Sequence, residues 1–192
     1  MKAPQPLAVT TLEFAVLRMA NLCVDVQQDL VEFLTTASVS ADPAATAMLR
    51  WLRKRGVRIA LLSDWSAEAT ATVLERIRWT VGEEGLVQCV VYDQQAEDNP
   101  VRSACELLGY SEGRAGISFT DTPRLLEAGR RAGIYFNVAF TNGQSTYNEL
   151  AREAHHAMLD QPVQLVNFLV EHSAPRRAGL RFRIGPPAGE TA

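Results

Sequence analysis

The stretch Gly116–Gly133, GISFTDTPRLLEAGRRAG, places a short apolar run, a polar junction and an amphipathic run one after another. Ala115–Phe119 has the length and the apolar content of a buried strand. Proline is favoured at the first position of a helix and glycine just after its end, so Pro123 and Gly133 predict a helix over Pro123–Ala132. A strand that leads directly into a helix is the repeating unit of an α/β fold.

The same order of strand and helix recurs on both sides of this stretch. The expected strands are Phe14–Leu17, Val57–Leu62, Leu86–Tyr92, Ala115–Phe119 and Ile134–Phe140. The expected helices are Ala44–Arg55, Ala67–Ile77, Pro100–Leu108, Pro123–Ala132, Thr146–Leu159 and Val163–His172. About five alternations of this kind predict a three-layer, doubly wound α/β fold with a mostly parallel sheet.

Length and composition fit one folded domain with short extensions. The chain has 192 residues, of which 47% are hydrophobic and 21% charged, and this composition excludes a disordered chain, a collagen and a coiled coil. We divide it into an arm (1–12), a core domain (13–172) and a Pro/Gly-rich tail (173–192). The tail carries four arginines against one glutamate, so it is basic. Within it, Leu180–Ile184 alternates apolar and basic residues, a pattern typical of an edge strand added in an oligomer.

Charge and cysteine content exclude several classes of partner. A net charge of −3 gives no basis for binding nucleic acid or an anionic membrane. No apolar run reaches the ~20 residues that span a bilayer, and the first eleven residues lack the apolar core of a signal peptide. Three widely spaced cysteines are typical of reduced, buried thiols. We therefore expect a cytoplasmic protein.

Polar side chains follow the expected strands directly. In a parallel α/β sheet, ligands bind at the carboxyl ends of the strands, so these residues are the candidates for a site. Asp121 and the pair Ser63–Asp64 could instead cap the helices that follow them. The candidate residues at the strand ends are Arg18, Ser63, Asp64, Asp93, Thr120, Asp121, Thr141 and Asn142.

Two segments that contain these strand ends resemble motifs of the haloacid dehalogenase superfamily, and in particular of its phosphonoacetaldehyde hydrolase branch. Gly116–Gly133 is similar to the fourth motif, a strand, an aspartate and a helix that closes in Glu-x-Gly-x-x-Ala-Gly, with Asp121 and Thr122 at the matching positions. Gly56–Ser66 resembles the second motif, with Ser63 at the position that binds phosphate. The resemblance covers roughly residues 13–172 and implies a Rossmann-like core.

The first and third motifs depart from the family pattern. Phe14–Asp25, FAVLRMANLCVD, resembles the first motif, but Arg18 stands where the family has its nucleophilic, magnesium-binding aspartate. Glu97 stands where the third motif has its lysine. Arginine stays protonated and repels Mg²⁺, so the resemblance implies a site that has lost its catalytic residues. The positions that still match the first motif are Ala20, Val24 and Asp25.

At these two positions the sign of the charge is opposite to that of the family, which suggests an ion pair within the site. A guanidinium at Arg18 could lie against Glu97 and Asp121 and replace the metal. This hypothesis requires a carboxylate of Asp121 or Glu97 within about 2.7–3.2 Å of the Arg18 guanidinium.

A second register of the first motif stays open. Leu22–Glu32, LCVDVQQDLVE, also resembles the general superfamily pattern. Asp25 would then be the nucleophile, and Gln27 would replace the acid/base aspartate. Asp25 and Asp121 would hold Mg²⁺, while Ser63 would contact the phosphate.

The family's helical cap is expected to be absent or vestigial. The segment Met19–Pro43, which precedes the helix expected at Ala44–Arg55, is too short for a helical bundle. The open strand ends would then contact a second copy of the chain or another protein.

The resemblance and its departures favour a non-catalytic binding or scaffolding protein without a cofactor. The alternatives are an Mg²⁺-dependent phosphate-ester or phosphonate hydrolase, and a sensor that binds a small phosphate or carboxylate metabolite through Arg18 and Ser63.

Overall fold

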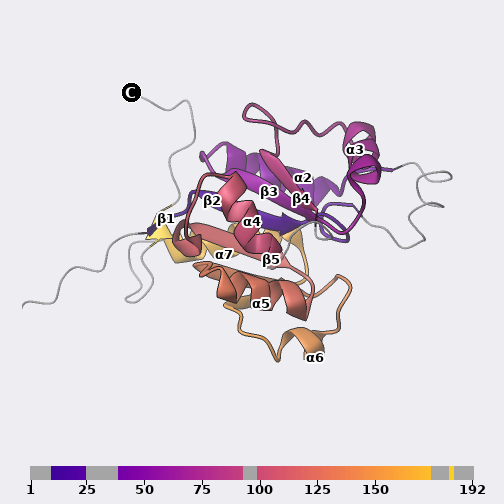
Figure 1. Ribbon diagram of the computed structural model, residues 1–192. Helices are drawn as coiled ribbons and strands as arrows, with labels where there is room; N and C mark the ends of the chain where they lie inside the picture. Colours follow the sequence, from indigo (N-terminus) through magenta and orange to yellow (C-terminus); the bar gives the residue numbers. More distant parts are fainter. Residues whose placement is uncertain (1–9, 25–38, 93–98, 174–181, 184–192) are drawn as a thin grey trace, which may run out of the picture.

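The computed structural model describes residues 10–24, 39–92, 99–173 and 182–183. These residues form a six-stranded, wholly parallel sheet with the order β4-β3-β2-β5-β6-β7 and helices on its faces (Figure 1). The strands are β2 (Phe14–Arg18), β3 (Arg58–Ser63), β4 (Cys89–Tyr92), β5 (Gly116–Thr120), β6 (Phe136–Phe140) and β7 (Ala157–Leu159). The helices are α2 (Pro43–Arg53), α3 (Ala67–Arg76), α4 (Pro100–Leu107), α5 (Pro123–Arg131), α6 (Tyr147–Leu150) and α7 (Pro162–Ser173). The doubly wound α/β fold predicted from the sequence is confirmed.

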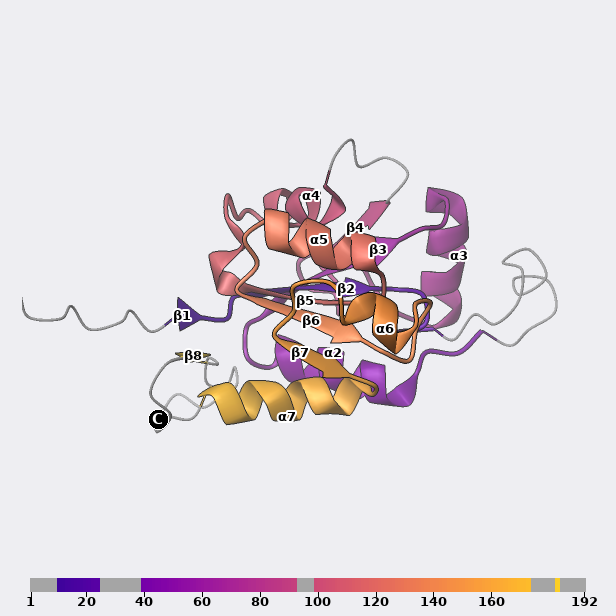
Figure 2. The same ribbon diagram turned by 90° about the horizontal axis from the view of Figure 1, so that it is seen from below.

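The strand order sets the position of the site. The chain runs from β2 outward through β3 to the edge strand β4, then returns past β2 to β5 and continues to β7. The order therefore reverses between β2 and β5, and in such sheets the crevice outside this switch point is where ligands bind. Figure 2 shows the layers on either side, with α4 and α5 on one face and α2 and α7 on the other.

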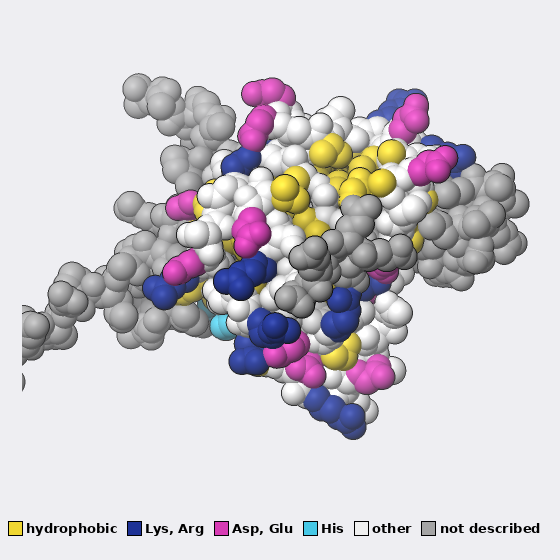
Figure 3. All heavy atoms as spheres, in the orientation of Figure 1, with side chains coloured by type: hydrophobic (Ala, Val, Ile, Leu, Met, Phe, Trp, Pro, Cys, Tyr) yellow, Lys and Arg dark blue, Asp and Glu magenta, His cyan; other side chains and the backbone are white. Residues whose placement is uncertain are grey.

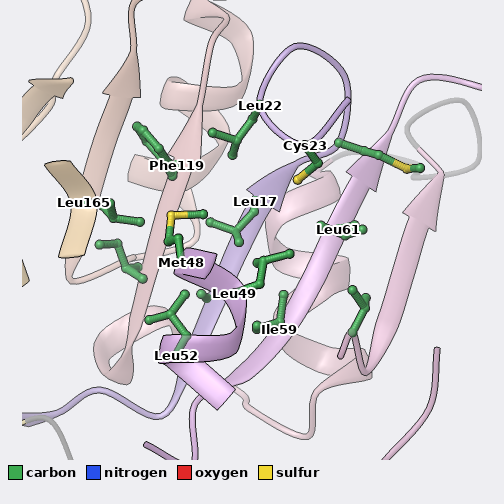
Figure 4. Packing of buried hydrophobic residues seen from close by; sticks show 14 of the residues in the cluster. Leu17, Leu22, Cys23, Met48, Leu49, Leu52, Ile59, Leu61, Phe119 and Leu165 are labelled. Carbon is green, nitrogen blue, oxygen red and sulfur yellow. The ribbon is translucent and has the colours of Figure 1, made fainter. Parts of the chain in front are cut away.

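The three central strands are buried along their whole length. Every residue of β2, β5 and β6 is buried, as expected for parallel strands covered on both faces. One apolar cluster joins the sheet to α2 and α7, and Figure 4 shows Leu17, Met48 and Leu49 meeting there. The other cluster joins the sheet to α4 and α5 through side chains such as Val101 and Leu125. This core holds the ends of β2 and β5 side by side.

The helix predicted over Thr146–Leu159 is wrong beyond its first turn. Thr146 and Glu149 form a capping box, so α6 begins as expected, but it ends at Leu150. The chain then turns, and His156 bonds to β6: its N–H donates to the Asn137 carbonyl oxygen at 2.8 Å, and its Nδ1 accepts from the Asn137 N–H at 3.0 Å. These bonds lead the chain into β7, so pairing with the sheet overrides the local helical preference.

Part of the tail pairs with part of the arm. β8 (Phe182–Arg183) lies parallel to β1 (Thr10–Thr11) in a separate two-stranded sheet. The strand expected in Leu180–Ile184 is therefore present at Phe182–Arg183, where it pairs with β1 of the same chain, and its addition to a sheet in an oligomer stays a prediction. No helix in the described part of the chain is long and apolar enough to cross a membrane.

Candidate functional site

Arg18 lies at the centre of the carboxyl edge of the sheet. It is the last residue of β2, and its side chain is 6% exposed. Because β2 lies between β3 and β5, the residues that follow those two strands flank it. Its Nε lies 3.0 Å from Asp121 Oδ1, and its Nη2 pairs with Asp64 Oδ2. The contact with Asp121 that the hypothesis required is present, whereas the replacement of a metal by the guanidinium stays a prediction.

Asp121 is fully buried, and its second oxygen is held by two donors. Oδ2 accepts from the backbone N–H of Gln144 at 2.8 Å and from Asn21 Nδ2 at 3.2 Å. The capping role considered for Asp121 belongs to its neighbour Thr122, whose Oγ1 accepts from the N–H of Leu125. Because Asp121 does not cap the helix, its carboxylate can lie in the site, where it contacts Arg18, Gln144 and Asn21.

Gln144 and Asn21 complete the cluster around Arg18, and the sequence reasoning missed both. Gln144 follows β6, and its Oε1 accepts from Arg18 Nη2 at 2.9 Å. Asn21 has a left-handed backbone with φ of 62°, a conformation that asparagine tolerates better than most residues. The sequence pointed to this loop through Thr141 and Asn142, the candidates at the end of the strand before it, but not to Gln144. Four segments of the chain therefore meet at one guanidinium–carboxylate cluster.

Gly143 allows this loop to approach Asp121. A Cβ at Gly143 would lie 2.3 Å from both Cβ and Oδ2 of Asp121, which is closer than any real contact. Because Asp121 is held in place, Gly143→Ala must displace the loop and weaken both contacts of Gln144. We expect the free energy of unfolding in urea to fall by about 1–3 kcal/mol. Asn142→Ala, an exposed change in the same loop, is the control, and equal stability of the two variants would contradict this account.

The remaining candidates at the strand ends take different positions. Ser63 ends β3 and is buried, but its Oγ is hydrogen-bonded to Thr70 Oγ1 at 2.8 Å and accepts from the Trp65 N–H at 3.3 Å. Its phosphate-binding role stays a prediction. Thr120 ends β5, and its buried hydroxyl has no hydrogen-bond partner among the described residues. Asp25, Glu97 and Asp93 lie outside the described residues, as do residues 25–38 of the segment where a cap would be inserted.

Asp64 is the carboxylate with the clearest electrostatic perturbation. Burial raises the pKa of Asp64 above its ordinary value, the Arg18 guanidinium lowers it in part, and the charge of Asp121 raises it further. Burial prevails although the side chain is 39% exposed and paired with Arg18. The ionised form of Asp64 therefore costs the folded state some stability.

This cost predicts a pH-dependent effect of Asp64→Asn. Because its pKa is raised on folding, Asp64 contributes stability that is complete below its unfolded pKa of about 3.9 and is lost as pH rises through the folded value. The variant lacks this loss, so its free energy of unfolding should improve relative to wild type between about pH 4 and pH 7. Glu127→Gln is the control with the opposite sign, since Arg130 lowers the pKa of Glu127. Parallel curves for wild type and Asp64→Asn would contradict the prediction.

The described residues do not fit a resident magnesium ion. Mg²⁺ requires oxygen ligands at about 2.0–2.1 Å in octahedral geometry. Here the Arg18 guanidinium contacts both Asp121 Oδ1 and Asp64 Oδ2, so a cation would have to displace it. Within the described ranges, no three His, Cys, Asp or Glu side chains come together as a metal site. The nearby Cys23 thiol is buried, and burial raises its pKa, so it does not supply a nucleophile either.

A polar hollow of about 470 Å³ opens beside the cluster. Two of its lining residues lie against Asp121: Asn21 donates a hydrogen bond to it, and Gly143 packs closely on it. The hollow therefore lies next to the carboxylate of Asp121. The residues that line it are Asn21, Leu22, Asp42, Ala44, Phe140, Asn142, Gly143, Asp160, Gln161 and Pro162. Its two charged lining residues are both aspartates, so the hollow does not favour an anionic ligand.

Comparison with known proteins identifies the fold class. No family model matches the sequence, and no curated protein matches it. Among solved structures, a HAD family hydrolase from Deinococcus radiodurans, with bound phosphate and sodium, aligns at a TM-score of 0.66 and 14% identity over 85% of this chain and 97% of that one. A haloacid dehalogenase-like family hydrolase from Streptococcus pneumoniae aligns at 0.63 and 10% identity, over 82% of this chain and 98% of its own. A predicted phosphatase from Clostridium acetobutylicum aligns at a TM-score of 0.65 and 10% identity, over 83% of this chain and 98% of that one.

These similarities define an α/β protein with the haloacid dehalogenase-like fold. At such low identities they establish the fold and no more. The assignment to the phosphonoacetaldehyde hydrolase branch and the loss of catalytic motifs stay predictions.

Proposed function

We propose that this chain is a non-catalytic binding or scaffolding protein built on a haloacid dehalogenase-like fold. The observation that supports this proposal is the Arg18 guanidinium, paired with Asp121 and Asp64 at the carboxyl end of the central strand. A guanidinium stays protonated in proteins and has no lone pair with which to attack phosphorus. The two carboxylates that could serve as bases or metal ligands are already engaged with it.

The charge balance of the cluster favours this reading over a metabolite sensor. The Arg18 guanidinium contacts two carboxylates, so these three side chains together are neutral or negative depending on the protonation of Asp64, on which the charge of Arg124 also acts. A phosphate or carboxylate ligand at Arg18 would be repelled by the charge of Asp121, which lies 3.0 Å from Nε of the same guanidinium. This repulsion disfavours anion sensing through Arg18.

The partner we propose is a protein and not a small molecule. With a cap absent or vestigial, the strand ends would be covered by a second copy of the chain or by another protein. The three described cysteines are all free, which is consistent with the cytoplasmic location that we propose.

The test is hydrolysis of a generic aryl phosphate with and without Mg²⁺. Wild type, Arg18→Ala and Asp25→Asn are compared after circular dichroism has shown that each is folded. We expect no turnover above buffer in any of them. Magnesium-dependent turnover that Asp25→Asn abolishes would overturn the proposal in favour of a hydrolase that uses Asp25, Asp121 and Ser63.

Titration with inorganic phosphate distinguishes a protein that senses a small anion from a non-catalytic scaffolding protein. The proposal predicts no saturable binding by isothermal calorimetry to wild type. Saturable binding that Arg18→Ala removes, while the fold survives, would replace the scaffold by a sensor of small anions.

A further inference from the structure

Asn142 and Gly143 lie in the loop that leads from β6 to α6. Asn142 is exposed, and it is the only one of the six asparagines in the chain that a glycine follows. α6 and this loop form the lower edge of the molecule in Figure 1, and Figure 3 shows that edge at the surface. Asparagine is among the chemically least stable residues of proteins. A following glycine, which has no Cβ, leaves the asparagine side chain open to attack by the next backbone nitrogen.

The two groups that would react make no hydrogen bonds to the described residues. The Gly143 N–H donates to none of them, and the side-chain amide of Asn142 has no partner among them. Both residues line the polar hollow of about 470 Å³, so the side chain of Asn142 has room to turn. The next residue differs, because the Gln144 N–H donates to Asp121 Oδ2 at 2.8 Å. The reactive nitrogen therefore lies one residue before the contact that holds the loop against the cluster.

We propose that Asn142–Gly143 is a site of spontaneous deamidation and that its isoaspartate product detaches this loop from Arg18 and Asp121. Hydroxide from the solvent removes the Gly143 N–H proton, and the nitrogen then attacks Cγ of Asn142. The bond between Cγ and the side-chain nitrogen breaks, ammonia leaves, and a cyclic imide closes. Water then opens the imide, so that one water is consumed and one ammonia is released over the two steps.

The carbonyl at which water opens the imide decides the product. Opening at Cγ gives aspartate and leaves the path of the backbone unchanged. Opening at the main-chain carbonyl carbon gives isoaspartate, in which the backbone runs through Cγ and is longer by one carbon. Both products add one negative charge, so a difference between their effects reports the change in the backbone.

The longer backbone is the change that the cluster does not accommodate. Gly143 packs so closely on Asp121 that a Cβ at this glycine would lie 2.3 Å from Asp121 Oδ2. Gln144 donates its N–H to Asp121, and its Oε1 accepts from Arg18 Nη2 at 2.9 Å. An extra backbone carbon directly before Gly143 displaces the loop, and the contacts of Gln144 are lost. The inference concerns how long the cluster stays intact and not what it binds, so it holds or fails independently of the proposed function.

The first test is peptide mapping by mass spectrometry after the folded protein has been incubated in mildly alkaline buffer. We expect Asn142 to convert into a mixture of aspartate and isoaspartate. Asn148 is the matched control, since it is exposed in α6 but the N–H of Glu149 after it is bonded to Thr146. Asn142 should react at least about tenfold faster than Asn148, a ratio that a barrier difference of about 1.4 kcal/mol produces. Equal rates, or a reaction at Asn142 only after unfolding in urea, would overturn the proposal.

The second test compares the two products directly. The isoaspartate form is isolated from aged protein by chromatography, and hydrogen exchange of the Gln144 amide is measured by NMR. The variant Asn142→Asp carries the same charge on an unaltered backbone. We expect the protection of this amide to fall by about tenfold in the isoaspartate form, as for the loss of one hydrogen bond, and to persist in Asn142→Asp.

Asn142→Gln, aged in the same way, is the control for damage elsewhere in the chain and should keep the protection of the Gln144 amide. If the isoaspartate form and Asn142→Asp protect this amide equally, the added backbone carbon does not detach the loop and the proposal is wrong.

Discussion

Arg18→Met is expected to lower the free energy of unfolding by about 3–5 kcal/mol, the usual effect of removing one partner from a buried ion pair. Asp121 would remain fully buried with its charge, and no other cation contacts it among the described residues. Methionine keeps most of the volume of the arginine side chain, so the loss reports the charge and not a cavity. Urea unfolding at neutral pH measures the effect.

The double variant Arg18→Met/Asp121→Asn identifies the origin of this loss. An asparagine oxygen at 121 still accepts from the Gln144 N–H and from Asn21 Nδ2, while the uncompensated charge is gone. We expect the double variant to be clearly more stable than Arg18→Met alone, which is the sign of direct coupling in a double-mutant cycle. Arg130→Met is the control, because Arg130 also pairs closely with a carboxylate, Glu127, but on the exposed surface. Equal effects of Arg18→Met and Arg130→Met would contradict a buried ion pair.

The contact between Arg18 and Asp121 could be predicted because both residues follow clear strands. FAVLR and GISFT are short apolar runs that end in polar residues, and the carboxyl ends of parallel strands meet at one edge of the sheet. The junction at Asp121–Pro123 and the helix after it are where the sequence placed them. For this part of the molecule, the local sequence patterns and the fold class together were sufficient to predict the contact.

The rest of the cluster could not be predicted, because it depends on loops. Gln144 reaches Arg18 only through the close approach of Gly143 to Asp121, and no local pattern specifies that approach. Asn21 contributes through its left-handed backbone, in the segment that resembles the first motif. Asp64 was a candidate at a strand end, but its pairing with Arg18 was not foreseen, since the family comparison directed attention to Glu97. In each case the missing information is which side chains from different loops come together.

The same limit explains the incorrect helix after Thr146. Its first turn is specified locally by the capping box of Thr146 and Glu149. Its end is specified by the bonds between His156 and Asn137, which join residues 19 positions apart. Sequence periodicity reports local preference and contains no information on that pairing.

Arg18→Asp is expected to convert the cluster into a binding site for a divalent cation. The variant would place a third carboxylate beside Asp121 and Asp64, where the guanidinium now lies between them. Without metal, the three like charges should repel and destabilise the folded state more than Arg18→Met does. Carboxylate oxygens are the ligands that Mg²⁺ and Ca²⁺ prefer, so either ion should restore stability in a saturable manner. At free metal about 100 times the dissociation constant, the gain is about 2.7 kcal/mol.

Wild type and Arg18→Asn are the controls, measured by urea unfolding in MgCl₂, in CaCl₂ and in NaCl of equal ionic strength. Neither should gain stability specific to the divalent ion, because the first retains the guanidinium and the second lacks the third carboxylate. If wild type gains as much as Arg18→Asp, a cation site exists that does not require Arg18 to move, and the hydrolase reading with Asp25 becomes the better one. If Arg18→Asp gains nothing, the two aspartates are not arranged around a cation position, and the guanidinium does not stand in for a metal.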